Sequence, residues 1–206
     1  MIREASFGDM GPARRVQSRR GGDQVDTDSR MMNTRGMAIG LYAGSFDPPH
    51  FGHLLLIEDA ARLCEKLFVV AVGNPNKPAG LFDLATRRRL LAASTEHLPS
   101  VVSLHHAGLV ADLARDLHVD LLIRSMGKDQ GIEFEMAVAN FRLAAIPTVF
   151  LPPKIDAQWV SSRAIRAEFQ AHGTLNVADL VPPAVLGALE QLDAAQYASA
   201  TSAQSN

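Results

Sequence analysis

Short apolar runs alternate with helical patterns along most of this chain. The apolar runs lie at 38–43, 67–73, 101–105, 120–124 and 148–151, and the helical patterns at about 52–64, 83–97, 109–117, 132–145, 162–171 and 183–193. Continuous apolar strands separated by helices are typical of a parallel sheet that is covered on both faces. The sequence therefore predicts an α/β doubly wound, Rossmann-like fold with a five-stranded parallel sheet. Ligands of such sheets bind at the carboxyl ends of the strands.

The two ends of the chain lack this alternation. Residues 1–36 are rich in Arg, Asp, Gly and Ser without a period, which indicates a disordered extension or a start codon assigned upstream of Met37. Residues 194–206 are mostly Ala, Ser, Gln and Thr, and they predict a flexible tail. The expected organisation is one folded domain over residues 37–193 between two flexible ends.

The composition argues against several kinds of partner. The formal net charge of −2, with both signs mixed along the chain, offers no basic field for nucleic acid and no polybasic signal for a membrane surface. No apolar run approaches the length of a membrane span. The single cysteine, Cys64, cannot form an internal disulfide or a cysteine-based zinc site, which fits a cytoplasmic location. We expect Cys64 to pack on the apolar side of the helix at 52–64.

The segment GSFDPPHFGH, residues 44–53, joins the first predicted strand to the first predicted helix. The free N–H groups of a helix's first turn attract anions, and the helix dipole adds partial positive charge there. His50 and His53 are three residues apart, so we expect them to project from the same face of the helix. This turn predicts a nucleotide-handling site with His50 and His53 as its catalytic candidates.

Polar residues also follow three other strands. Lys77 lies in the loop after the second strand, Arg124 ends the fourth, and Ser161 and Ser162 open a helix after the fifth. Together these cations, hydroxyls and N–H groups predict a site for a polyphosphate and a second anion. Transfer of a nucleotidyl or phosphoryl group depends mainly on in-line positioning and on neutralising charge, for which Mg²⁺ is suited. The run 87–89, three arginines, is interpreted as a solvated helix face.

The HxGH turn and the serine-opened helix resemble the nucleotidyltransferase superfamily, which transfers AMP or CMP from a nucleoside triphosphate. Within it, residues 38–192 most resemble bacterial phosphopantetheine adenylyltransferases. The motifs that carry this resemblance are, in order, GSFDP, the Asn-Lys-Pro loop followed by Leu81-Phe82, Gly108–Val110, Asp120–Arg124, Glu133–Met136, Val149–Pro152, Val160–Ser162 and Leu180–Pro183.

The resemblance implies an enzyme that joins AMP from Mg-ATP to 4′-phosphopantetheine, in the cytoplasm and as a homo-oligomer, a hexamer in the family. It implies that His53 stabilises the pentavalent phosphate. It implies that ATP is bound by Ser45, Phe46, His53, Ser125, Met126, Gly127, Glu135, Ala157, Gln158, Trp159, Val160, Ser161, Ser162 and Arg163. It implies that the acceptor is bound by Ser45, Lys77, Val110 and Arg124. The metal ligands stay unassigned.

Four positions depart from the pattern of this family. His50 stands where the family usually has threonine, Gly127 where it has arginine, Gly131 where it has aspartate, and Arg163 where it has a third serine. HxGH and Ser-Ser-x-x-Ile-Arg are more typical of nicotinate or nicotinamide mononucleotide adenylyltransferases, so a pyridine mononucleotide is the alternative acceptor. A further alternative is a divergent nucleotide-binding paralogue that has lost catalysis.

Overall fold

Five parallel strands form the centre of the molecule, in the spatial order β3-β2-β1-β4-β5. The computed structural model describes residues 37–73, 80–126, 130–154 and 160–203. The strands span Ala38–Gly44 (β1), Cys64–Val72 (β2), Val101–His106 (β3), Leu121–Ser125 (β4) and Thr148–Leu151 (β5). The chain builds outward from β1 through β2 to β3 and then returns to the other side of β1, so the order reverses between β1 and β4. This arrangement confirms the predicted fold class, and the reversal is where doubly wound sheets bind ligands.

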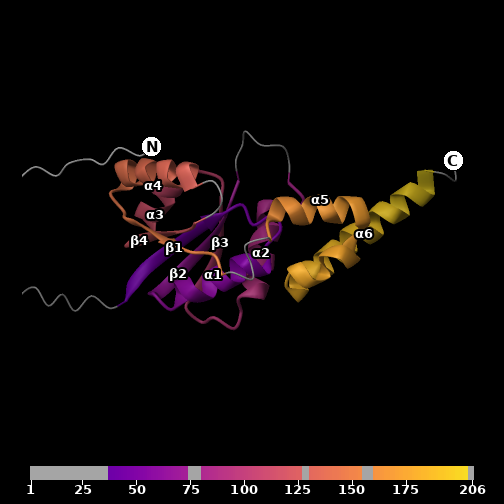
Figure 1. Ribbon diagram of the computed structural model, residues 1–206, viewed down its shortest axis with the longest axis horizontal. Coiled ribbons are helices and arrows are strands. Elements are labelled where there is room, and N and C mark those ends of the chain that lie inside the picture. Colours follow the sequence, from indigo (N-terminus) through magenta and orange to yellow (C-terminus); the bar gives the residue numbers. More distant parts are fainter. Residues whose placement is uncertain (1–36, 74–79, 127–129, 155–159, 204–206) are drawn as a thin grey trace, which may run out of the picture. The chain divides into compact units, whose positions relative to one another are not determined.

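Helices cover both faces of the sheet, as Figure 1 shows. The helices are α1 (Phe51–Ala61), α2 (Leu84–Ser94), α3 (Val110–Asp116), α4 (Gln130–Ala144), α5 (Ser162–His172), the 3-10 helix η3 (Thr174–Leu180) and α6 (Pro183–Ala203). Successive residues of β1 serve opposite faces, because side chains alternate along a strand. Tyr42 packs in the core under α1, whereas Leu41 packs with α3 on the other face.

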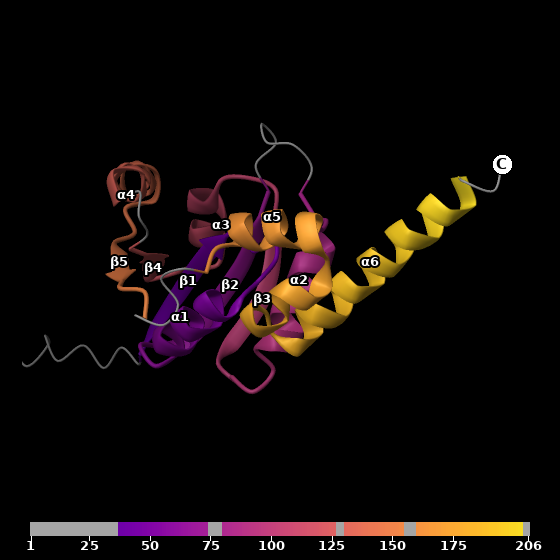
Figure 2. The ribbon, with the colours of Figure 1, turned by 45° about the vertical axis from the view of Figure 1, so that its right-hand side comes forward.

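A third apolar cluster joins α2 to the C-terminal helices. Phe82 and Leu90 pack there against Ile165 and Phe169 of α5 and against Leu189 of α6. Figure 2 shows α5 and α6 next to α2, with α6 extending away from the sheet. This cluster matters for the site because it holds α5, the serine-opened helix, beside the carboxyl edge of the sheet. No helix among the described residues has the length and apolar character needed to cross a membrane.

Three helix starts have residues that favour that position. Asp83 caps α2, since its carboxylate accepts a hydrogen bond from the Thr86 N–H at 2.7 Å. Ser161 caps α5 by accepting from the Ala164 N–H at 3.2 Å. Pro183 is the first residue of α6, a position where its missing N–H costs no hydrogen bond.

Two predicted boundaries are wrong. Cys64 is the first residue of β2 rather than the end of a helix, because α1 stops at Ala61 and Cys64 already pairs with Ala38 of β1. The Cys64 side chain is nevertheless buried, as expected, and this burial raises the pKa of its thiol. Near the C-terminus, the helix predicted over residues 183–193 is longer than expected. Helix α6 continues to Ala203, through residues whose composition predicted a flexible tail. The alanines there are strong helix formers, which explains the longer helix.

Candidate active site

The turn between β1 and α1 brings its two histidines together. His50 is the N-cap of α1, and its carbonyl accepts hydrogen bonds from the N–H groups of His53 at 2.9 Å and Leu54 at 3.2 Å. The backbone N–H of His50 donates to Nδ1 of His53 at 3.3 Å. The two rings stack, with centroids 3.6 Å apart and planes 26° from parallel. The prediction that both side chains share one face of the helix start is confirmed.

Burial keeps both imidazoles neutral at pH 7. It lowers the pKa of His50 from 6.5 to about 4. The pKa of His53 lies well below its ordinary value, first because of burial and second because of the neighbouring His50. Since Nδ1 of His53 accepts a hydrogen bond, we assign the ring proton to Nε2, which makes Nε2–H a donor. Nδ1 of His50 is buried and has no hydrogen-bond partner within the described ranges.

Phe46 forms the floor of this turn. Its ring is fully buried and meets His53 edge to face at a centroid distance of 4.8 Å and Tyr42 at 5.3 Å. The backbone of Phe46 has a φ of 45°, a left-handed conformation that non-glycine residues adopt at tight turns. The phenyl ring therefore supports His53, and any contact of Phe46 with a nucleotide falls to its backbone.

Asp47 ties this turn to two other segments. Its carboxylate, 4% exposed as a residue, accepts hydrogen bonds from the N–H groups of Leu81 at 3.0 Å and Phe82 at 2.9 Å. It also pairs with Nε of Arg87 at 3.3 Å and with Nη1 of Arg166 at 3.7 Å. We refer to Asp47, Arg87 and Arg166 as the Asp47 hub.

The sequence interpretation of Arg87 is wrong. Rather than lying on a solvated helix face, Arg87 is buried, and it donates from Nε to the carbonyl of Phe82 at 2.7 Å and from Nη1 to that of Ser45 at 3.2 Å. Arg88 and Arg89 are more exposed than Arg87. Nothing in a run of three arginines distinguishes the buried one, and only the phase of the apolar positions Leu84, Leu90 and Leu91 on α2 could have suggested it.

The serine-opened helix reaches the histidine turn, as predicted. The Ser162 hydroxyl donates to the carbonyl of Pro48 at 2.9 Å, and Arg166 donates from Nη1 to the carbonyl of Asp47. Arg163 is exposed. The N-terminus of α5 and the N-terminus of α1 thus lie at one edge of the sheet, joined by direct hydrogen bonds.

Arg124, predicted to bind the acceptor, lies on β4 next to β1. Its Nε donates to Oε2 of Glu133 on α4 at 2.5 Å, and its Nη2 donates to the sulfur of Met136 at 3.4 Å. Tyr42 lies close enough for its pKa to respond to both charges, although burial dominates and raises it. The pairing of Glu133 with Arg124 could not be predicted, because the motif position of Glu133 does not show which way α4 faces.

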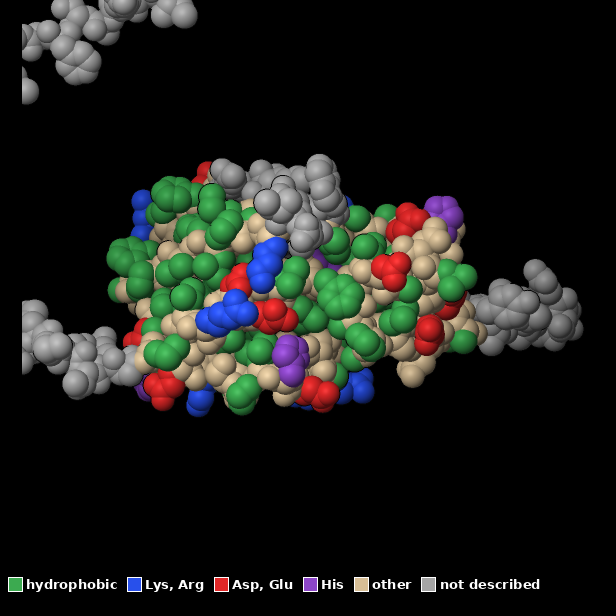
Figure 3. Space-filling view, turned by 60° about the horizontal axis from the view of Figure 1, so that its bottom comes forward, with side chains coloured by type: hydrophobic (Ala, Val, Ile, Leu, Met, Phe, Trp, Pro, Cys, Tyr) green, Lys and Arg blue, Asp and Glu red, His purple; other side chains and the backbone are tan. Residues whose placement is uncertain are grey.

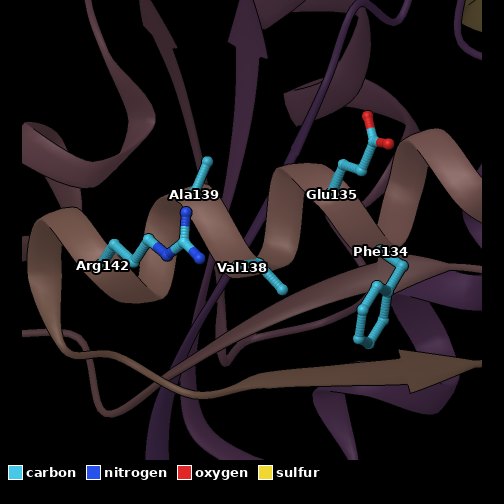
Figure 4. A pocket seen from close by; sticks show the side chains of 5 residues that line it. All are labelled: Phe134, Glu135, Val138, Ala139 and Arg142. Carbon is cyan, nitrogen blue, oxygen red and sulfur yellow. The ribbon is translucent and has the colours of Figure 1, made fainter.

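The remaining predicted residues are more scattered. Ser125 ends β4, Met126 follows it and is exposed, and Val110 begins α3 and packs half-buried against the core. Glu135 lines an open groove on α4 with Phe134, Val138, Ala139 and Arg142, shown in Figure 4. All described residues that line this groove belong to α4. Lys77, Gly127, Ala157, Gln158 and Trp159 lie outside the described residues.

Comparison with known proteins defines the class first. The model of the family described as cytidylyltransferase-like matches residues 41–168, which places the chain among nucleotidyltransferases. A phosphopantetheine adenylyltransferase of Haemophilus ducreyi is 40% identical over 153 residues, covering 73% of this chain and 93% of the relative. The enzyme of the same name from Streptococcus equi is 38% identical over 160 residues, covering 75% and 94%. The chain belongs to the phosphopantetheine adenylyltransferase family.

A solved structure supports the fold. A putative nicotinate-nucleotide adenylyltransferase from Vibrio parahaemolyticus superposes with a TM-score of 0.53 at 16% identity, over 73% of this chain and 97% of that one. At this identity the likeness concerns the fold alone.

Proposed function

We propose that this chain transfers the adenylyl group of ATP to 4′-phosphopantetheine, forming dephospho-CoA and pyrophosphate. A phosphate oxygen of phosphopantetheine attacks the α-phosphorus of ATP, and the bond from that phosphorus to the bridging oxygen of the β-phosphate breaks in line. The observation that carries the proposal is the pair of neutral histidines at the carboxyl end of β1, in a turn whose Pro48 carbonyl accepts a hydrogen bond from Ser162 of α5, in a chain of this family.

In this proposal His53 supplies a preorganised hydrogen bond. Its Nε2–H donates to an oxygen of the α-phosphate as negative charge accumulates in the transition state. The ring needs no reorientation, because Nδ1 is already held by the backbone of His50 and the ring by Phe46. His50 packs against His53 and adds a second neutral imidazole to the phosphate site.

The two substrates are proposed to use different parts of the edge. ATP contacts Ser45, the backbone of Phe46, residues 125–127, Glu135 and residues 157–163. The acceptor's phosphate is held by Lys77, Arg124 and Ser45, and its arm by Val110. Arg124 suits this role, since among residues 37–73, 80–126, 130–154 and 160–203 its guanidinium donates only from Nε to Glu133 and from Nη2 to Met136.

Magnesium is proposed to enter as Mg-ATP. The described residues hold no group of three or more His, Cys, Asp or Glu side chains suited to a metal ion. Mg²⁺ is often carried by substrate phosphates with few protein ligands, and it offsets charge on the triphosphate. We therefore treat the ion as part of the substrate.

We also propose that the chain forms a homo-oligomer, a hexamer by resemblance to the family. Large apolar side chains are exposed on α4 and β5, among them Phe134, Phe141, Leu143 and Val149. Hydrophobic side chains gather at the end of the molecule that carries these elements, on the left in Figure 3. Such a gathering marks an interaction surface. The single free cysteine supports a cytoplasmic location.

A pyrophosphate-release assay with separate acceptors tests the proposal. We expect turnover with ATP and 4′-phosphopantetheine and none with nicotinate mononucleotide. Turnover with nicotinate mononucleotide and not with 4′-phosphopantetheine would support the alternative acceptor, a pyridine mononucleotide, which His50 in the HxGH turn favours. Absence of turnover with either acceptor would indicate the non-catalytic paralogue.

A further inference from the structure

The Asp47 hub contains more positive than negative charge. One buried carboxylate faces two guanidinium groups, whose side chains are 11% (Arg87) and 32% (Arg166) exposed. Arg87 lies closer to the carboxylate, at 3.3 Å against 3.7 Å, and its other contacts are the carbonyls of Phe82 and Ser45. Asp47 is thus already satisfied by the N–H groups of Leu81 and Phe82 and by the charge of Arg87, and the need to neutralise a buried charge does not account for Arg166.

Arg166 and Ser162 together hold the first turns of α5 against the turn that precedes α1. Their donors meet the carbonyls of Asp47 and Pro48, which follow each other directly and lie two to three residues before His50. The partners are 119 and 114 residues apart in the chain, so these bonds set a distance that no local structure determines.

That distance matters under the proposed function, on which this inference rests. In that proposal His53 contacts the α-phosphate of ATP, and Ser161 and Ser162 at the N-terminus of α5 contact the same ATP molecule, where the free N–H groups of the first turn suit a phosphate. The spacing between α5 and the histidine turn then decides whether one triphosphate reaches both. A displacement of about 1 Å at such a site can cost roughly 100-fold in rate.

We propose that Arg166 is a positioning residue that holds α5 at the spacing from His53 that a triphosphate requires. The positive charge of the hub that Asp47 does not neutralise also favours binding of the triphosphate at this edge of the sheet. Replacing Arg166 with alanine removes the guanidinium bond to the Asp47 carbonyl, whereas R166K keeps a cationic donor on a similar stem.

The test measures ATP affinity by isothermal titration calorimetry, in the presence of Mg²⁺ and without acceptor, together with kcat and Tm. R89A is the matched control, since Arg89 is exposed and donates only to Thr86 within α2 among the described residues. We expect wild type and R89A to bind ATP with the same affinity. We expect R166K to bind ATP more weakly than wild type does, and R166A to bind it at least about tenfold more weakly. Because the Arg166 side chain is 32% exposed and Arg87 still faces Asp47 in the variant, we expect Tm to fall by no more than about 4 °C.

Any other order of affinities, or equal affinities across the series, overturns the proposal. If R166A does not fold, R166K against wild type decides the question, with weaker ATP binding at unchanged Tm as the predicted result. A wild type that binds ATP but transfers no AMP would refute the proposed function instead, because the affinity series needs no acceptor.

Discussion

Replacing His50 with threonine should make the protein less sensitive to acid. Burial lowers the pKa of His50 to about 4 in the folded state, whereas the unfolded chain has the ordinary value of 6.5. Below pH 6.5 the unfolded state therefore binds a proton that the folded state rejects, so the free energy of unfolding falls as the pH falls from 6.5 towards 4. The depressed pKa of His53 acts in the same direction.

The size of the effect follows from the linkage relation. For His50 alone, the two pKa values give a loss of about 2 kcal/mol in the free energy of unfolding between pH 7 and pH 5. Threonine does not titrate, and it is a favourable N-cap residue, so His50→Thr leaves the start of α1 intact. The exposed pairs His97–Glu58 and His172–Glu168 remain in both proteins and cancel in the difference.

Urea denaturation of wild type and His50→Thr at pH 7 and pH 5 measures this difference. We expect the wild type to lose about 2 kcal/mol more than the variant between the two pH values. Equal losses in the two proteins would show that folding does not lower the pKa of His50. The interpretation of His50 as a buried imidazole that stays neutral at pH 5 would then be wrong.

Two further predictions concern the turn between β1 and α1 and the Asp47 hub that holds it. His53→Ala should lower kcat by roughly 10²–10³-fold, the effect of removing one preorganised donor, while Tm falls by only a few degrees; a large loss of stability would mark His53 as structural. Gly80→Ala places a methyl group against the carboxylate of Asp47 and the guanidinium of Arg87, so we expect losses of both Tm and activity. The matched control is Gly187→Ala on α6, whose added methyl meets nothing within 4 Å and should stabilise the helix by up to about 1 kcal/mol. If thermal melts and kinetics show no difference between the two glycine variants, the Asp47 hub does not constrain this turn.

The fold and the main features of the site could be predicted because they depend on local signals. Apolar runs located all five strands, and the rule that ligands bind at carboxyl ends predicted that the turn before α1 lies beside the serine-opened helix, to which Pro48 of that turn is hydrogen-bonded. The caps at Asp83 and Ser161 depend on residues three apart, which a sequence displays directly.

The Asp47 hub could not be predicted, because it depends on distances in space between residues far apart in the chain. Arg87 belongs to the same run of three arginines as the exposed Arg89, and only the packing of α2 buries Arg87. The pairing of Arg124 with Glu133 likewise depends on how α4 crosses β4. The end of α1 was misplaced because Leu63 and Cys64 continue an apolar pattern after the helix has stopped.

Following the α-phosphate of ATP tests the central claim most directly. The wild-type protein is incubated with ATP labelled at the α-phosphate, Mg²⁺ and either 4′-phosphopantetheine or nicotinate mononucleotide, and the labelled products are separated. We predict that label appears in dephospho-CoA with the first acceptor and stays in ATP with the second. Label that moves to the pyridine nucleotide, or stays in ATP with both acceptors, would contradict the account.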